Sequence, residues 1–231
     1  ELTVKLQDNQ WVSIVCGRSR TRIAGMDREA FPDLPEMPSK IADIPVATLA
    51  SVIGKTIFAI SQEESRFTLN GALLILKSDS LTMVATDGHR LAYVEYPAAF
   101  PGIAKPYRAL LPRKAMQEIL KLASEAASDA TLAFSGDDNH FFFGLGDRLL
   151  LSRRMTGNFP DYERVLPKDQ PSTITLSREE FKSALERVAQ FADERSRAIR
   201  VSVDDGEAVI RSSTDGTGES EETLCIDHAG S

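Results

Sequence analysis

The feature that most constrains the fold of this chain is an internal repeat of about 130 residues. The tripeptide Phe-Pro-Asp occurs at residues 31–33 and again at 159–161, an offset of 128 residues. The apolar alternation of Val4 and Leu6 returns at the same offset as Leu132 and Phe134. Self-similarity at a fixed period indicates copies of one structural unit.

A helical pattern repeats at nearly the same distance. The first stripe consists of Leu49, Ile53, Ile57 and Ile60, and the second, 132 residues later, of Phe181, Leu185, Ala189 and Ala192. Only residues 39–168 hold a complete unit. We therefore expect residues 1–38 to form the latter half of a first unit and residues 169–231 the first half of a third. Because the sequence also starts within a strand pattern and without a methionine, we expect it to be a piece of a longer chain.

Each half of the complete unit combines one helix with several strands. Apolar residues spaced by three and four predict helices over residues 47–61 and 112–126, the second opening at Pro112, which favours the first turn of a helix. The strands expected after them cover residues 67–76, 81–85 and 91–96, and then 131–134, 140–145 and 148–155. One helix followed by antiparallel strands, repeated, indicates an α+β fold whose helices line one face of the sheets.

Composition restricts the functional class. The 231 residues carry a net charge of -7, which argues against a protein that coats nucleic acid with its whole surface but permits one basic face. No apolar run approaches the roughly 18 residues of a membrane helix, so we expect a cytoplasmic protein with no membrane partner. Cys16 and Cys225 stand alone, without the spacing of a disulfide framework or a zinc site, and we expect no metal and no cofactor.

The segment from Val84 to Ala92 is the most distinctive in the chain. Asp87 and Gly88 between two apolar strands predict a tight hairpin turn, in which glycine supplies a positive φ. That turn does not explain why Thr86, His89 and Arg90 accompany it. Three interpretations remain open at this point: a turn without function, a binding surface, or a catalytic Asp-His pair.

Signals of catalysis are otherwise weak. His89, His140 and His228 lack the spacing of metal ligands, and the sequence contains neither G-x-S-x-G nor a glycine-rich phosphate loop before a helix. A pair of Asp87 and His89 would still need a nucleophile from elsewhere in the chain. A small hydrolase using this pair is kept as the alternative function.

Clustered charges indicate two further surfaces. Arg113 and Lys114 open the second helix, where cations oppose the helix dipole, so either a solvated helix end or an anionic partner explains them. Arg18, Arg20 and Arg22 alternate as if on one face of a strand. Three glutamates form an acidic counterpart near the other terminus, namely Glu219, Glu221 and Glu222. Opposite charges at opposite ends suit either solubilising edges or a head-to-tail contact between two copies.

Four segments together resemble one known family, the bacterial replicative sliding clamp, which is the beta subunit of DNA polymerase III. These segments are Arg66–Gly71, Val84–Ala92, Leu111–Lys114, and Gly157–Tyr162 with Val165–Pro167. The resemblance runs through nearly the whole chain. It implies three similarly folded domains per protomer and a homodimer whose two protomers join head to tail in a ring around duplex DNA. The ring would be a non-enzymatic tether that slides without reading sequence and gives polymerases a docking surface.

The resemblance also implies partners and site residues. The partners would be duplex DNA, the alpha subunit of DNA polymerase III, the clamp loader and other proteins with a clamp-binding peptide motif. The peptide pocket would comprise Leu69, Thr86, Gly88, His89, Arg90, Leu91, Pro160 and Val165. DNA would face Arg66, Phe67, Arg113 and Lys114. The protomer interface would pair Arg18 and Arg20 with Glu219, Glu221 and Glu222. Thr68 departs from the family, in which a tyrosine is common there, and the family's C-terminal pocket residues lie beyond Ser231.

Overall fold

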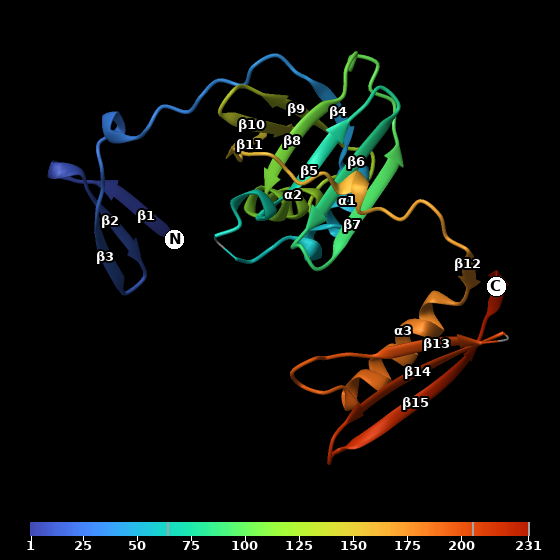
Figure 1. Cartoon of the computed structure of the whole chain (residues 1–231). Coiled ribbons are helices and arrows are strands. Elements are labelled where there is room, and N and C mark those ends of the chain that lie inside the picture. Colours follow the sequence, from blue (N-terminus) through green and yellow to red (C-terminus); the bar gives the residue numbers. More distant parts are fainter. Residues whose placement is uncertain (64, 205, 231) are drawn as a thin grey trace. The chain divides into compact units, whose positions relative to one another are not determined.

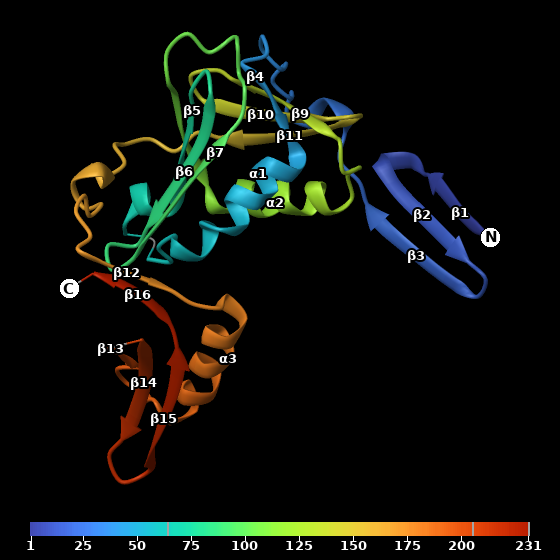
Figure 2. The same cartoon turned by 90° about the vertical axis from the view of Figure 1, so that its right-hand side faces the viewer.

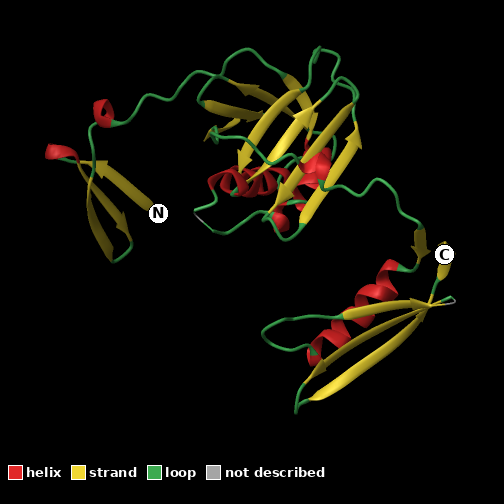
Figure 3. Cartoon of the chain, in the orientation of Figure 1, coloured by secondary structure: helices red, strands yellow, loops and turns green. Residues whose placement is uncertain are grey.

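The computed structural model describes residues 1–63, 65–204 and 206–230, and Figure 1 shows the course of the chain. The chain divides into two compact units, Glu1–Phe159 and Pro160–Ser231, each of which is described by itself. Strands dominate both units, as Figure 3 shows. All the pairings between described strands are antiparallel, which confirms the predicted α+β class.

The first strands of the chain form a separate antiparallel sheet in the order β1-β2-β3. These strands are β1 (Leu2–Leu6), β2 (Trp11–Cys16) and β3 (Ser19–Ala24). Gly17, at a φ of 56°, and Arg18 make the turn between β2 and β3. The prediction of three arginines on one strand face is therefore wrong for Arg18, because the turn begins before it. Arg20 and Arg22 do lie on β3, and the Arg22 guanidinium stacks over Trp11 at 4.9 Å.

The middle of the chain forms two four-stranded sheets and two helices. One sheet has the order β7-β6-β5-β8 and the other β11-β10-β9-β4. The strands of the first sheet are β5 (Gly71–Leu76), β6 (Ser80–Thr86), β7 (Leu91–Pro97) and β8 (Tyr107–Pro112). Those of the second are β4 (Ala42–Pro45), β9 (Thr131–Gly136), β10 (His140–Leu145) and β11 (Arg148–Arg153).

The helices α1 (Val46–Gly54) and α2 (Arg113–Ser124) lie side by side against these sheets, as Figures 1 and 2 show. Helix α1 contacts β4, β6 and β7, and α2 contacts β8 and β11. The core between helices and sheets contains fully buried side chains from both halves, among them Leu49, Met83 and Phe134. The predicted pairing of two helix-and-sheet halves within residues 39–168 corresponds to this shared core.

Helix α1 is shorter than the expected 47–61. It ends at Gly54, a poor helix former, and a separate 3-10 turn follows at Ile57–Ala59. The buried hydroxyl of Thr56 donates to the carbonyl oxygens of Val52 at 2.8 Å and Ile53 at 3.3 Å. These bonds satisfy carbonyl groups that the end of a helix leaves free, and they stop the helix seven residues early.

Two strand predictions also need correction. Residues 67–69 form a 3-10 turn, η4 (Phe67–Leu69), rather than the start of a strand, because the Leu69 N–H bonds to the Arg66 carbonyl oxygen at 2.8 Å. Strand β11 ends at Arg153, two residues before the predicted Met155. The second helix lies where it was predicted but is shorter than 112–126: it ends at Ser124, and Pro112 is the extended residue before its first turn.

The second unit has one helix, α3 (Arg178–Val188), against the sheet β13-β14-β15. Its strands are β12 (Ser172–Thr175), β13 (Arg200–Asp204), β14 (Glu207–Thr214), β15 (Gly218–Cys225) and β16 (Asp227–Gly230), with β12 and β16 paired separately. The Ser177 hydroxyl caps α3. Among the described residues of this unit, Ala184, Val188 and Ile210 form a fully buried cluster, which is smaller than the cluster of the middle sheets. None of the described helices is long and apolar enough to cross a membrane.

Candidate functional site

The turn between β6 and β7 lies at the centre of the candidate site, and its first support is the side chain of Thr86. Thr86 ends β6 and is 8% exposed. Its hydroxyl donates to the Arg90 carbonyl oxygen at 2.7 Å and accepts from the Gly88 N–H at 3.1 Å. One hydroxyl therefore closes both ends of the turn. Gly88, at a φ of 90°, supplies the left-handed conformation predicted from the sequence.

The carboxylate of Asp87 is the second support of the turn. One of its oxygens accepts from the backbone N–H groups of His89 and Arg90, each at 3.0 Å, and the other accepts from Nε of Arg90 at 3.1 Å. These bonds, that from the His89 N–H foremost, favour the ionised form and lower the pKa of Asp87 below its ordinary value of 3.8. Asp87 is thus a turn-capping residue whose charge is present at neutral pH.

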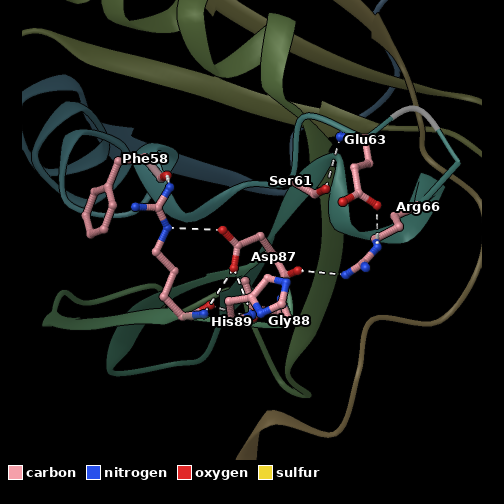
Figure 4. Close-up of polar contacts among 9 residues, drawn as sticks. Phe58, Ser61, Glu63, Arg66, Asp87, Gly88 and His89 are labelled. Atoms are coloured by element: carbon pink, nitrogen blue, oxygen red, sulfur yellow. Dashed lines mark hydrogen bonds and ion pairs between the residues drawn. The ribbon is translucent and has the colours of Figure 1, made fainter. Parts of the chain in front are cut away.

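Two arginine side chains tie the turn to neighbouring segments, and Figure 4 shows Arg66 beside Asp87. Arg66 donates through Nη1 to the Asp87 carbonyl oxygen at 2.9 Å and forms an ion pair with Glu63 at 2.7 Å. Arg90 donates to the Phe58 carbonyl oxygen at 2.9 Å, and its guanidinium stacks over the Phe58 ring at 5.7 Å. The sequence analysis missed both contacts because they join residues 21 and 32 positions apart in the chain.

The predicted Asp-His pair has a different geometry from a catalytic pair. Asp87 bonds to the backbone N–H of His89, and among the described residues no hydrogen bond joins the carboxylate to the imidazole. The turn instead presents the exposed side chain of His89 to solvent. This geometry argues against a catalytic Asp-His pair, whereas a binding surface at this turn stays a prediction.

Leu69 and Leu91 flank the turn with half-buried apolar side chains, at the end of η4 and the start of β7. The segment after β11 packs against η4, because a Cβ on Gly157 would lie 2.6 Å from Cγ2 of Thr68. Gly157 has a φ of 105°, so this position needs glycine for conformation as well as for space. Thr68 is therefore in close contact with the segment that follows β11.

The remaining predicted pocket residues, Pro160 and Val165, belong to the second compact unit. Both lie in the segment before β12, where Tyr162 is buried and Val165 is 67% exposed. The structure thus brings six of the eight predicted pocket residues to one turn and its flanks: Leu69, Thr86, Gly88, His89, Arg90 and Leu91. The placement of Pro160 and Val165 at the same pocket stays a prediction.

The residues predicted to face DNA lie in two connected places. Arg113 and Lys114 are the first residues of α2, and the Arg113 N–H bonds to the carbonyl oxygen of Asn70, the residue after η4, at 3.2 Å. Phe67 opens η4 and is 74% exposed. The contacts of Arg66 described above give it a role in the turn that was not predicted, and its contact with DNA stays a prediction.

The predicted acidic side of a protomer contact is divided between two faces of β15. Glu222 forms an ion pair with Arg187 on α3, and that contact lowers the pKa of Glu222. Glu221 pairs with Arg211 on the neighbouring strand β14. Because side chains alternate along a strand, Glu219 and Glu221 share the face opposite to Glu222. Arg20 on β3 is exposed, as is Arg18 in the turn before it.

Comparison with protein families matches nearly all of the middle and C-terminal parts of the chain. Residues 43–161 match the central domain of the DNA polymerase III beta subunit, and residues 163–231 match its C-terminal domain. The beta sliding clamp of Chlamydia muridarum (strain MoPn / Nigg) is 30% identical over 99% of this chain and 62% of its own length. That of Pseudomonas aeruginosa is 30% identical over 96% of this chain and 60% of its own length.

Solved structures of beta subunits match this chain as well. The DNA polymerase III subunit beta from Pseudomonas aeruginosa superposes with a TM-score of 0.89 at 28% identity, covering 100% of this chain and 62% of that one. A sliding clamp from the same organism, bound to griselimycin, has a TM-score of 0.88 at 29% identity, covering 99% and 61%. The chain therefore spans less than two thirds of the length of the relatives it matches.

Proposed function

Because the chain belongs to the DNA polymerase III beta subunit family, we propose that it is part of a sliding clamp, which encircles duplex DNA and tethers a replicative polymerase to it. In this proposal the chain is not an enzyme. It holds DNA inside a ring formed with a second copy, and it docks a short hydrophobic peptide of the polymerase alpha subunit, the clamp loader or other partners. The observation that carries the proposal is the rigid turn at residues 86–91.

The turn has the properties that peptide docking requires. Its backbone is held by Thr86, Asp87 and the side chains of Arg66 and Arg90, so little conformational entropy remains to be lost on binding. His89 is exposed on this turn, and Leu69 and Leu91 are half-buried apolar residues at the end of η4 and the start of β7. Apolar surface with a few fixed polar groups is typical of sites for short hydrophobic peptides. We propose that Pro160 and Val165 complete this site.

DNA binding by such a ring needs no contact with bases. Weak phosphate attraction by a few cations suffices, and it lets the ring slide. We propose that the half-buried Arg113 and the exposed Lys114, at the start of α2, supply part of this attraction together with Phe67 and Arg66. A net charge of -7 is compatible with this role because only the inner face needs to be basic.

The contact between two copies would use the charges at the two ends of the chain. Arg18 and Arg20 would form ion pairs with Glu219 and Glu221 of a second copy, while Glu222 stabilises its own strand through its ion pair with Arg187.

The test of the docking site is a titration with a fluorescent peptide of the Gln-Leu-x-Leu-Phe type. Saturable binding is expected, and His89→Ala and Leu91→Ala should each weaken it by about tenfold, the loss typical of one contact at the centre of an interface. Tyr96→Ala is the matched control, since Tyr96 is an exposed residue at the other end of β7. Equal affinity in all four proteins, or no binding by the unmodified chain, would contradict the proposal.

A further inference from the structure

We infer that Arg154 is a positioning residue for the proposed peptide site, because it fixes the segment 154–157 that packs against η4. This inference rests on the proposed function. Arg154 follows the last residue of β11 and lies outside the predicted pocket. Its role comes from where its side chain and the next three residues lie.

Arg154 is held at three points, two in the turn between β9 and β10 and one on β10 itself. Its backbone N–H donates to the Asn139 carbonyl oxygen at 2.8 Å, and its Nη1 donates to the Asp137 carbonyl oxygen at 2.7 Å. The guanidinium also stacks over the fully buried ring of Phe141 at 4.9 Å. Stacking on a ring while donating a hydrogen bond to a carbonyl oxygen suits the planar guanidinium, which presents several fixed donors, better than an ammonium group.

We call these three contacts of Arg154 the Arg154 latch. The turn that accepts its hydrogen bonds is itself held by hydrogen bonds. The Asp137 carboxylate accepts from the backbone N–H groups of Asn139 at 2.7 Å and His140 at 2.6 Å. These bonds, first that from Asn139, lower the pKa of Asp137, so the carboxylate is ionised at neutral pH. The turn is built like the one at Asp87, with an aspartate capping two following N–H groups and an arginine bonded to its carbonyl oxygen.

The residues after Arg154 connect this latch to the proposed peptide site. Met155 packs on Gly71, the first residue of β5, so closely that a Cβ there would overlap with the Met155 sulfur. Gly157 then packs on Thr68 within η4, two residues after Arg66 and one before Leu69. The segment 154–157 is thus held at one end by Arg154 and rests at the other on the structure that carries Leu69.

From this geometry, loss of the Arg154 latch would free the segment and loosen its contact with η4 while the turn at 86–91 stays intact. The effect on the peptide would be indirect, through the position of Thr68 and Leu69. Arg153 offers a matched control: it is the neighbouring arginine, and its side chain is exposed.

The experiment compares Arg154→Ala, Arg154→Lys and Arg153→Ala in the full chain. Peptide affinity is measured by the fluorescence titration, the position of the segment by the NMR signal of the Met155 methyl group, and stability by thermal unfolding. Arg154→Ala should weaken peptide binding by about tenfold, the scale of one charged hydrogen bond, and shift the Met155 signal. Arg154→Lys should restore part of the affinity, and Arg153→Ala should change neither quantity.

A second variant addresses the segment from its other end. Gly157→Ala places a methyl group against Thr68 and leaves the latch intact, so it should weaken binding and move the Met155 signal as well. Unchanged affinity in both Arg154→Ala and Gly157→Ala, or a loss of thermal stability with no loss of affinity, overturns the inference. Failure of the unmodified chain to bind peptide contradicts the proposed function itself, which separates the two outcomes.

Discussion

Replacing Thr86 by valine tests whether a single hydroxyl holds the turn at the candidate site. Valine keeps the shape of threonine, so the change removes two hydrogen bonds and little else. The Gly88 N–H and the Arg90 carbonyl oxygen would both lose the partner they have now. Gly88 and Arg90 are exposed residues, so water replaces part of each lost bond, and each loss costs about 0.5–1.5 kcal/mol. We expect Thr86→Val to lower the free energy of unfolding by about 1–3 kcal/mol in total.

Thr86→Ser is the control, because serine keeps the hydroxyl and loses only a methyl group, a change of about 1 kcal/mol or less. Urea unfolding should be followed by far-ultraviolet circular dichroism, since the single tryptophan, Trp11, lies in β2 outside the middle sheets. Hydrogen exchange at the Gly88 amide localises the effect: protection should fall in Thr86→Val and persist in Thr86→Ser. Equal stability of the two variants, with equal Gly88 protection, would refute the reasoning about this hydroxyl.

Three further predictions follow from the same structure. Phe134→Ala should lower the free energy of unfolding by about 3–5 kcal/mol in urea titration, because the ring is fully buried against Tyr107, Phe141 and Phe143; a loss below about 1 kcal/mol would contradict its place in the core. The pKa of Asp87 is lower in the folded protein than its ordinary value of 3.8, so the ionised carboxylate should stabilise the fold fully above pH 3.8, and this stabilisation should be lost as pH falls through the folded pKa. Asp87→Asn should flatten this part of the curve of unfolding free energy against pH. An unchanged curve would contradict the capping role of Asp87. Reversing Arg18 and Arg20 to glutamate should weaken self-association in analytical ultracentrifugation, each exposed pair contributing about 0–1 kcal/mol, whereas unchanged association would refute their place at the protomer contact.

The fold follows from sequence where local patterns and packing agree. Helix α2 was predicted because Pro112 precedes a stripe that the structure buries through Ala115, Met116 and Ile119. Strand β10 was predicted with its observed ends, His140 and Leu145. In both elements, local preference and burial point to the same structure, which is why the sequence pattern was sufficient.

Predictions failed where a side chain bonds back to the main chain or a turn imitates a strand. The Thr56 hydroxyl ends α1 inside a continuing apolar stripe, and periodicity alone does not register this bond. Phe67 and Leu69 alternate like strand residues, yet η4 turns the chain and leaves Phe67 largely exposed. In both cases, local hydrogen bonds determine the structure where the hydrophobic pattern predicts something else.

The candidate site was predicted in part. The pair Asp87 and Gly88 predicted the turn because Asp-Gly between apolar strands is typical of a tight hairpin. The family resemblance predicted which neighbouring residues belong to the site. The supports from Arg66, Arg90 and Arg154 were not predicted, because each arginine bonds to a carbonyl oxygen 17 to 32 residues away. The one signal available in the sequence was indirect: Gly71 lies within a predicted strand and Gly157 shortly after another, and the structure shows that another segment approaches each of them closely.

The central claim is that the turn at residues 86–91 docks a partner peptide, and mapping of backbone amide signals by NMR during a titration with the Gln-Leu-x-Leu-Phe type peptide tests it most directly. The account predicts saturable shifts concentrated at residues 66–70, 86–91 and 155–165. Shifts confined to the start of α2 or to the sheet β1-β2-β3, or no shifts at saturating peptide, would contradict it.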